Sequence, residues 1–280
     1  MKKKSGDRRQ LALGAAVLVL SLLTAGCSQA AGMQLKPKGT TTEIKVEQPV
    51  VVAASKTFTN KSNTVELKQL SDKLWMQTTY KDFGDQQVPA NGLIVSTEAG
   101  LVLLDTAWDD TLMQEVMAMI KQHIQQQVVL AVITHAHLDR IGGIQTLLDE
   151  GIEVQSSSLT ARLAMKQGFP EPAGVLDDNP KFQVGGTAFE TYYPGAGHTI
   201  DNLVVWLPQT KTLYAGCVVL GSDVTKLRKT DEAYVTQWPD AVRQLMTTFN
   251  EAKFVIPGHG TWGDYSLLQH TLDILLAQRT

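Results

Sequence analysis

The chain has 280 residues, of which 43% are apolar, so it can fill the core of one large domain or two small ones. A net charge of −3 without a basic tract argues against a nucleic-acid partner. Two cysteines cannot form a disulfide framework, and no run of 18 apolar residues could span a bilayer.

The first 26 residues have the features of an export signal. Met1–Gln10 is basic, and Leu11–Leu23 is a run of 13 apolar or small residues, whereas a spanning helix needs about 20. The following Leu-Thr-Ala-Gly-Cys resembles a bacterial lipoprotein box, in which the cysteine, here Cys27, carries the lipid. Ser28 after it implies sorting to the outer membrane. We expect a periplasmic protein anchored to the outer membrane through Cys27, with a soluble periplasmic protein as the alternative.

The segment after Cys27 has a composition that disfavours folding. Cleavage before Cys27 would remove five basic residues and one acidic residue and leave a net charge of −7. Residues 27–63 are rich in Thr, Lys, Gln, Ala and Ser and contain one aromatic residue, Phe58. Such a segment cannot bury enough surface to offset its ordering entropy, so we expect a flexible tether. The folded domain is expected over residues 64–280.

The domain begins with four strand-like segments separated by turn-forming residues. They are Val65–Leu70, Leu74–Tyr80, Gly92–Thr97 and Leu101–Asp105. Asp109 or Asp110 then caps a predicted helix, because apolar residues from Leu112 to Ile120 recur at helical spacing. Val128–Ile133 is a continuous apolar strand, and Gly142–Glu150 is a short helix.

Residues 157–180 are more irregular, and the elements after them are again strands followed by helices. The strands are Thr187–Tyr193, Asn202–Leu207, Thr212–Val219 and Lys253–Ile256, and the helices are Trp238–Phe249 and Tyr265–Gln278. This order predicts an α/β fold in which two sheets pack face to face, with helices on the outside.

The strongest chemical signal follows the apolar strand. His135-Ala136-His137-Leu138-Asp139 is a His-x-His-x-Asp motif, which composition alone would produce with a probability of roughly 0.01. Histidines two apart in an extended segment point the same way, so both imidazoles can bind one cation. Asp139, where the chain turns into a helix, can face a neighbouring site.

Three further donors follow later strands, each beside glycine or another small residue. They are His198, Cys217 and His259. Together with the motif they make two sets of three donors suited to zinc, each with room for water. Taken singly, His198 or His259 is more often a core or capping histidine, and Cys217 a small buried apolar residue. Their joint occurrence with His-x-His-x-Asp favours metal binding.

These residues carry a family resemblance. In order, His-Ala-His-Leu-Asp-Arg-Ile-Gly-Gly, Gly-His-Thr-Ile-Asp-Asn, Ala-Gly-Cys and Pro-Gly-His-Gly resemble the metallo-β-lactamase superfamily, specifically the di-zinc first subclass of class B β-lactamases. The resemblance extends over about Val65–Leu276. Relatives that hydrolyse thioesters or phosphodiesters usually have His after the Asp, and a bridging Asp at the position of Cys217. Arg140 and Cys217 therefore favour the lactamase subclass.

The resemblance implies an αββα sandwich with two zinc ions at one edge of its two mixed sheets. The first zinc would be held by His135, His137 and His198, and the second by Asp139, Cys217 and His259. Asp105 and Arg140 would orient these ligands from behind. Residues 80–90 would form a mobile flap over the substrate, with Phe83 as its apolar contact.

The implied reaction is hydrolysis of the β-lactam amide bond, which inactivates the antibiotic. Zinc lowers the pKa of water from about 15.7 to about 7, so a zinc-bound hydroxide is available as nucleophile near neutral pH without a side-chain base. The second zinc, held by Asp139 and the Cys217 thiolate, would receive the anionic nitrogen when the C–N bond breaks.

The chain departs from the family where the substrate carboxylate binds. The position of the family's lysine, three residues after the cysteine, is Leu220, and that of a carbonyl-binding asparagine is Lys229. We expect Lys229, or else Lys226 or Arg228, to supply the cation; otherwise these three are solvated loop charges. Asn202 is a further candidate for substrate binding.

Two other functions stay open at this point. The protein could be a thioester or lactone hydrolase, or a zinc-binding lipoprotein that has lost productive substrate binding at Leu220 and Lys229. We expect a monomer whose partner is a small-molecule β-lactam.

Overall fold

The computed structural model describes residues 55–227 and 231–278. The predicted signal peptide, Cys27 and most of the predicted tether lie outside the described residues. Within the described part of the chain, no helix is long and apolar enough to cross a membrane.

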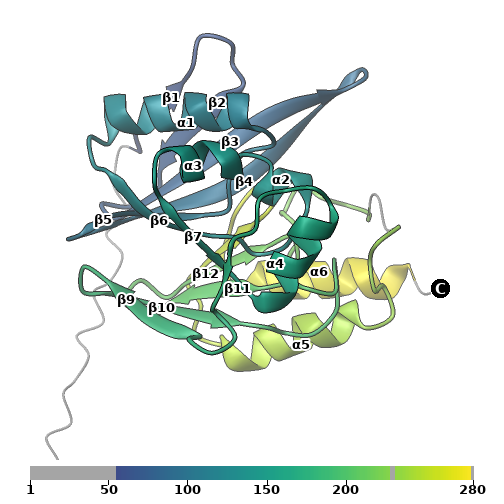
Figure 1. Cartoon of the computed structure of the whole chain (residues 1–280). Coiled ribbons are helices and arrows are strands. Elements are labelled where there is room, and N and C mark those ends of the chain that lie inside the picture. Colours follow the sequence, from purple (N-terminus) through teal and green to yellow (C-terminus); the bar gives the residue numbers. More distant parts are fainter. Residues whose placement is uncertain (1–54, 228–230, 279–280) are drawn as a thin grey trace, which may run out of the picture. The chain divides into compact units, whose positions relative to one another are not determined.

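Two mixed sheets form the centre of the fold (Figure 1). The first has eight strands in sequence order, antiparallel from β1 to β5 and parallel from β5 to β8. They are β1 (Thr57–Thr59), β2 (Val65–Gln69), β3 (Leu74–Phe83), β4 (Gln86–Thr97), β5 (Gly100–Leu104), β6 (Val128–Val132), β7 (Glu153–Ser156) and β8 (Ala173–Gly174).

The second sheet has five strands in the order β13-β12-β11-β10-β9, and only the β12–β13 pair is parallel. They are β9 (Lys181–Val184), β10 (Thr187–Tyr192), β11 (Val204–Leu207), β12 (Thr212–Gly216) and β13 (Phe254–Pro257).

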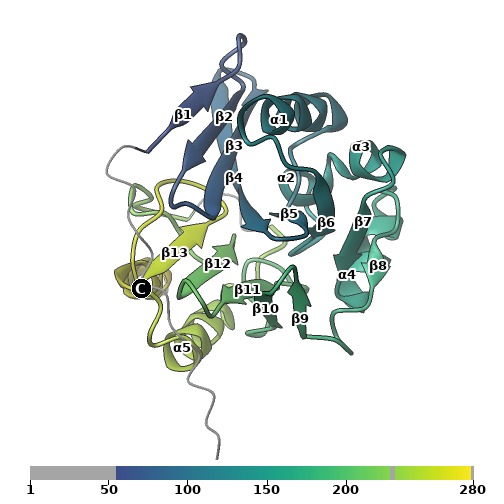
Figure 2. The same cartoon turned by 90° about the vertical axis from the view of Figure 1, so that its left-hand side faces the viewer.

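Helices cover the outer face of each sheet (Figures 1 and 2). Four pack on the first sheet: α1 (Asp110–His123), α2 (Leu138–Ile141), α3 (Ile144–Asp149) and α4 (Ser158–Lys166). Two pack on the second: α5 (Trp238–Thr248) and α6 (Ser266–Ala277). The layers are therefore α, β, β, α, as the sequence predicts.

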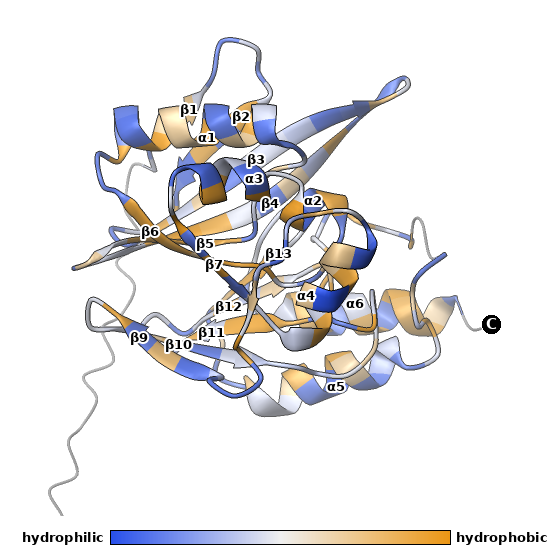
Figure 3. Ribbon diagram, viewed as in Figure 1, coloured by the Kyte–Doolittle hydropathy of each residue, from blue (hydrophilic) through white to orange (hydrophobic). Residues whose placement is uncertain are grey.

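Three apolar cores separate these four layers, and strand periodicity assigns residues to them. In β5, Leu101 and Leu103 pack toward the helices, while Val102 and Leu104 pack toward the other sheet. In β12, Leu213 faces α5 and α6, while Tyr214 lies between the sheets. Because successive strand side chains point to opposite faces, a strand covered on both sides is apolar throughout. Figure 3 shows this as continuous apolar colour along the central strands.

Several sequence-based boundaries differ from the structure. Folding begins before residue 64, because β1 pairs with β2 and its central residue, Phe58, packs against the core. The two strands predicted to end at Tyr80 and to begin at Gly92 are longer: β3 and β4 continue through residues 80–90 as a hairpin that turns at Gly84–Asp85. The irregular middle contains α4, where the Thr160 amide donates to the N-cap residue Ser157 and the Ser158 amide donates to Asp177.

Candidate metal centre

Six potential ligands meet where strands of both sheets end. His135, His137 and Asp139 follow β6 of the first sheet. His198 lies between β10 and β11, and Cys217 and His259 follow β12 and β13 of the second sheet. Each set of three donors therefore has members from both sheets, and in each set the donor atoms lie within 4.8 Å of one another.

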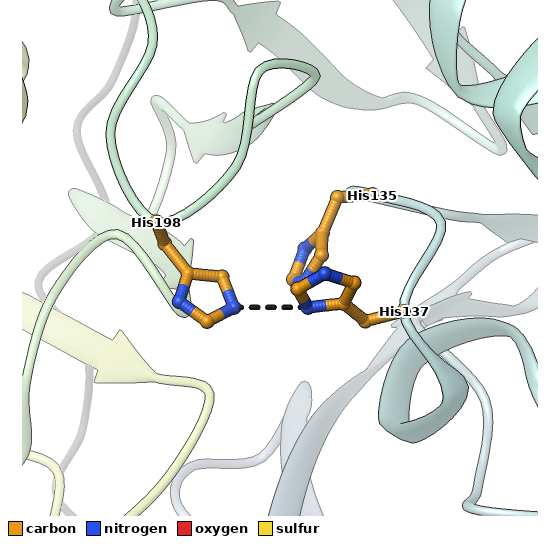
Figure 4. Close-up of side chains that lie close together, drawn as sticks. All are labelled: His135, His137 and His198. Atoms are coloured by element: carbon orange, nitrogen blue, oxygen red, sulfur yellow. Dashed lines mark hydrogen bonds between the residues drawn. The ribbon is translucent and has the colours of Figure 1, made fainter. Parts of the chain in front are cut away.

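The first set consists of three imidazoles in a nearly equilateral arrangement (Figure 4). The ring centroids of His135, His137 and His198 are 4.8, 5.0 and 5.1 Å apart. The Nδ1 atom of His137 lies 3.1 Å from Nε2 of His198. The Nε2 atom of His135 is buried and has no hydrogen-bond partner.

Backbone contacts hold the loops of the first set together. The amide of Ala136, between the two histidines, donates to Asp201 Oδ2 at 3.0 Å. The amide of Leu203 donates to the carbonyl of Thr134 at 2.9 Å. The segment after β6 is thus joined to the loop that carries His198, so the three rings keep their positions.

The electrostatics keep His135 and His198 neutral. Burial is the main reason why the pKa of His135 lies well below its usual value, with His198 and His137 as further causes. Burial, with His137 beside it, lowers the pKa of His198 to about 3. A neutral imidazole has the free lone pair that a metal ion needs.

The second set combines a carboxylate, a sulfur and an imidazole. Asp139 Oδ2 lies 3.7 Å from Cys217 Sγ and 2.9 Å from His259 Nε2. The carbonyl of Pro89 accepts a hydrogen bond from His259 Nδ1 at 2.6 Å, which turns Nε2 toward the other two donors. The close approach needs glycine at 258, because a Cβ there would lie 2.6 Å from Cys217 Sγ.

Arg140 is fully buried and holds Asp139 in place. Its Nε and Nη2 atoms donate to Asp139 Oδ2 at 2.8 and 2.7 Å, and Nη2 also donates to the carbonyl of Gly258 at 2.8 Å. Its Nη1 atom donates to the carbonyl of Asn91 at 2.5 Å. A buried guanidinium with these partners fixes a carboxylate in both charge and direction.

Asp105 lies behind Arg140 in a strained conformation. Its φ of 65° is in the left-handed region that non-glycine residues rarely adopt. The amide and hydroxyl of Thr134 donate to its carboxylate at 2.7 and 2.8 Å, and its carbonyl accepts from Gln77 Nε2 at 3.2 Å. These contacts compensate the strain and bring the carboxylate close to Arg140.

The charges of the second set depend on one another. Burial would raise the pKa of Asp139, but Arg140 and His259 hold it well below the usual value. Burial would lower the pKa of His259, but the neighbouring Cys217 and Asp139 raise it to about 10. Without metal, His259 is therefore protonated and provides the positive charge that these groups attract.

Both sets fit a metal ion. In the first, His135 Nε2 and one nitrogen from each of the other two imidazoles lie close together. The His135 nitrogen is buried without a hydrogen-bond partner, and such an atom is costly unless a ligand satisfies it. In the second, a carboxylate, a sulfur and an imidazole lie around a position that binds positive charge. Imidazole and cysteine donors with one carboxylate are the ligand types that zinc prefers.

An apolar wall lies beside the second set. Phe83, at the tip of the β3–β4 hairpin, has a 45% exposed side chain and packs edge-on against Trp108, with centroids 5.2 Å apart. The Trp108 ring in turn lies 6.1 Å from the His259 ring. Lys81 of the hairpin pairs with Asp109, the N-cap of α1, at 2.6 Å.

The predicted substrate cations are only partly described. Arg228 and Lys229 lie outside the described residues. Lys226 is exposed and lines a surface hollow with His270 and Asp273 of α6. Lys226 therefore lies against α6, and its assignment to substrate binding stays a prediction. Leu220 packs against the core between the second sheet and its helices.

The assignment of Asn202 to substrate binding is also wrong. Asn202 is buried, and its amide is saturated by its own loop. Its Oδ1 accepts from the amide and hydroxyl of Thr199, and its Nδ2 donates to the carbonyls of Gly195 and Thr199, all at 2.7–3.0 Å. Asn202 therefore shapes the loop that carries His198 and has no donor left for a ligand.

Three residues near the donor sets were missed. Glu232 Oε2 lies 2.6 Å from His137 Nε2, and the Trp238 ring lies 5.6 Å from the ring of His198. The hydroxyl of Tyr214 contacts Asp105 and Arg140. Only Tyr214 had a signal in the sequence: a tyrosine in an otherwise apolar strand needs a partner for its hydroxyl. Nothing in the sequence pattern marks Glu232 or Trp238.

Comparison with known proteins agrees with this geometry. Residues 86–259 match the family model of the metallo-beta-lactamase superfamily. The chain is 42% identical over 231 residues to the metallo-beta-lactamase type 2 of Bacillus sp. (strain 170), covering 82% of this chain and 87% of that protein. It is likewise 42% identical over 220 residues to the metallo-beta-lactamase type 2 of Bacillus cereus, covering 79% of this chain and 86% of that protein.

The fold is similar to that of a solved relative. The metallo-beta-lactamase from Pontibacter korlensis superposes with a TM-score of 0.72 at 42% identity, covering 76% of this chain and 99% of that protein. The family model spans more than half of the chain, and both donor sets lie within the segment it matches. The chain belongs to the metallo-β-lactamase superfamily.

Proposed function

We propose that this protein is a zinc hydrolase that opens the amide bond of β-lactams. The observation that carries the proposal is the convergence of a three-imidazole set and an Asp-Cys-His set within one site. The named relatives, 42% identical over most of the chain, support the same activity.

The proposed cofactor is a pair of zinc ions, one for each donor set. His135, His137 and His198 would hold one ion, and Asp139, Cys217 and His259 the other. When bound, zinc lowers the pKa of water from about 15.7 to about 7 and polarises carbonyl oxygens, which makes amide hydrolysis possible near neutral pH.

The other residues of the site would position and shield the reacting groups. Arg140 keeps Asp139 anionic and would direct its carboxylate at the metal position. Phe83 and Trp108 would cover the apolar part of a bound lactam and exclude water from it. The hairpin around Gly84 would act as the flap over the substrate.

Hydrolysis of a chromogenic cephalosporin tests the activity. We expect the purified protein to hydrolyse the substrate. The hydrolysis should stop when a chelator removes the metal and should recover when zinc is added back. Metal analysis of the same sample should give two zinc ions per chain. Bound zinc without turnover of penicillins, cephalosporins or carbapenems would identify a non-catalytic zinc-binding protein. Turnover of thioesters or lactones alone would identify a different hydrolase.

For the substrate carboxylate, we propose Lys229, with Arg228 beside it, as the cation that replaces the lysine expected at position 220. The side chain of Leu220 packs into an apolar core and cannot bind an anion. We expect Lys229→Ala to raise KM for carboxylate-bearing lactams about tenfold, the effect of losing one charged hydrogen bond. Lys226→Ala is measured beside it, and a rise in KM in that variant instead would assign the role to Lys226. Lys121→Ala, an exposed lysine in the last turn of α1, is the control and should leave kcat/KM unchanged. An unchanged KM in both Lys229→Ala and Lys226→Ala would mean that these loop charges are simply solvated.

We further propose that the chain is exported to the periplasm and anchored to the outer membrane by a lipid on Cys27. The lipoprotein-like sequence around Cys27 supports this proposal. Labelled palmitate should be incorporated into the wild-type protein in bacterial cells and not into Cys27→Ala, which should appear in the soluble periplasmic fraction. A wild-type protein found only in that fraction would favour a cleaved, soluble form.

We also propose that the protein acts as a monomer, because one chain supplies both donor sets. A sedimentation measurement that gives the mass of one chain would support this proposal, and a dimer mass would contradict it.

A further inference from the structure

A tyrosine hydroxyl is buried directly behind the second donor set. Tyr214 of β12 is fully buried in the core between the two sheets. Its hydroxyl lies 2.7 Å from Asp105 Oδ2, 2.9 Å from the carbonyl of Asn91 and 3.2 Å from Arg140 Nη1. It thus touches the two charged groups that support Asp139 and a backbone carbonyl of the opposite sheet.

The geometry determines which of these contacts the hydroxyl makes as donor. It has one proton, and the shortest contact, to the Asp105 carboxylate, is also the charge-assisted and therefore the stronger one. A lone pair of the hydroxyl then accepts from Arg140 Nη1. The carbonyl of Asn91 has its own donor in Arg140 Nη1 at 2.5 Å.

The hydroxyl closes a gap between Asp105 and Arg140. Arg140 Nη1 and Asp105 Oδ2 are 3.5 Å apart, longer than a normal hydrogen bond. Tyr214 bridges them with two shorter contacts, so the guanidinium is held on the side away from Asp139 as well as on the side facing it. Without the hydroxyl, that side of the guanidinium would keep only its hydrogen bond to Asn91 and the longer ion pair with Asp105.

The same residue is also close in sequence to a ligand. Tyr214 is the middle residue of β12, and Cys217 directly follows the end of this strand, so a contact that fixes the tyrosine also restrains the strand end that carries the sulfur. Asp139 and Cys217 come from different sheets and must keep their separation of 3.7 Å to hold one ion. Tyr214 is linked to Asp139 through Arg140 and to Cys217 through its own strand.

We propose that Tyr214 is a positioning residue of the second metal site, which sets the separation of the Asp139 and Cys217 ligands through its hydroxyl. The inference rests on the proposed function, in which this set holds a zinc ion. The hydroxyl touches neither substrate nor metal, and it acts through Arg140 and through the end of β12.

Tyr214→Phe removes the hydroxyl and keeps the ring that packs between the sheets. Zinc affinity of each donor set is measured by competition with a chromogenic chelator, and the second set is followed separately by the cobalt–thiolate absorption of the cobalt-substituted protein. We expect Tyr214→Phe to weaken binding at the second set about 10- to 100-fold, the usual effect of losing a group that supports a ligand, and to leave the three-histidine set within about twofold. The hydroxyl of Tyr265 donates to the carbonyl of Met246. Tyr265→Phe is therefore the matched control and should change the zinc affinity of neither set.

A second comparison tests the route through Arg140. If the hydroxyl acts on Arg140, combining Tyr214→Phe with Arg140→Lys should weaken the second set little more than Arg140→Lys alone, whereas independent effects would multiply. If Tyr214→Phe does not fold without metal, the rates at which a chelator withdraws the two ions from the zinc-loaded protein give the same comparison.

The outcomes separate this inference from the proposed function. Equal weakening of both sets would indicate a merely structural tyrosine and would overturn the inference, as would an unchanged second set. Absence of the cobalt–thiolate band from the wild-type protein would overturn the second site itself and the inference with it. A wild-type band that is selectively weakened in Tyr214→Phe supports both.

Discussion

Asn202 is the residue on which the His198 loop depends. Four hydrogen bonds of its buried amide close the turn between Gly195 and Thr199, and His198 lies within that turn. A side chain with this role resembles a ligand-binding residue in the sequence, because it is polar and lies in a glycine-rich motif. Its real function is to keep His198 at its distance from His135 and His137.

Asn202→Ala should therefore weaken both folding and metal binding. The Gly195 carbonyl and the Thr199 amide would each lose the hydrogen bond with Asn202, which costs about 1–3 kcal/mol in the free energy of unfolding, whereas the Thr199 carbonyl would keep the Gly197 amide. Zinc binding at the three-histidine set should weaken about tenfold, because His198 is no longer held. Urea unfolding and chelator competition measure the two effects. The exposed Asn179→Ala is the control, and a variant with intact zinc affinity would contradict this role.

The pKa of His259 has a consequence for the metal-free protein. Because this pKa is raised to about 10 in the folded state, the protonated ring stabilises the fold at low pH. The contribution is fully present below the unfolded pKa of about 6.5 and is lost as the pH rises through about 10. We expect the free energy of unfolding in chelator to fall between pH 6.5 and 10, as measured by urea titration. His259→Gln should flatten this part of the curve, and an unchanged slope in the variant would contradict the assignment.

At the scale of elements, the hairpin of β3 and β4 is attached to α1 near its tip. Lys81 pairs with the N-cap residue Asp109, and Phe83 packs on Trp108, so two contacts hold the hairpin beside the second donor set. Both partners of the ion pair are partly exposed, so the pair contributes little to stability. Its effect is on where the tip of the hairpin lies.

Phe83→Ala should affect substrate binding more than folding. Losing the ring removes about 1 kcal/mol of apolar contact with a bound lactam, so KM should rise about fivefold while kcat changes little. The effect should be largest for lactams with aromatic side groups. Gln86→Ala, directly opposite on the hairpin and exposed, is the control. Steady-state kinetics on two substrates decide the question, and a fall in kcat with KM unchanged would mean that the hairpin does not contact the substrate.

How much of this was predictable differs between elements and contacts. The central strands and the His-x-His-x-Asp motif could be predicted because their signals are local: apolar runs, turn residues and ligand chemistry at fixed spacing. The strand β1 could not, because it is only three residues long, with Phe58 between two threonines, and its pairing with β2 makes it a strand. The roles of Tyr214 and Asn202 depend on partners brought together by folding, and a sequence pattern does not contain them.

At the scale of the whole molecule, the donor sets connect the two sheets. Each set takes ligands from both sheets. The first set has two ligands from the segment after β6 and one from the second sheet, and the second set has one from the segment after β6 and two from the second sheet. Bound metal ions would therefore cross-link two layers that otherwise meet mainly through an apolar core. Such a cross-link stabilises the folded state because the unfolded chain has no preformed site.

Removing zinc should lower the melting temperature strongly. At free zinc about 1,000 times Kd, each site adds about 4 kcal/mol to the free energy of unfolding, and a domain of this size gains about 2–4 °C per kcal/mol. The melting temperatures of the zinc-loaded and the chelator-treated protein, measured by calorimetry, should thus differ by about 15–30 °C. Cys217→Ala and His198→Ala should each remove about half of that difference, because each eliminates one set and leaves the other. If either variant alone lost the whole difference, the two sites would form one cooperative unit; if neither lost any, the ions would not connect the sheets.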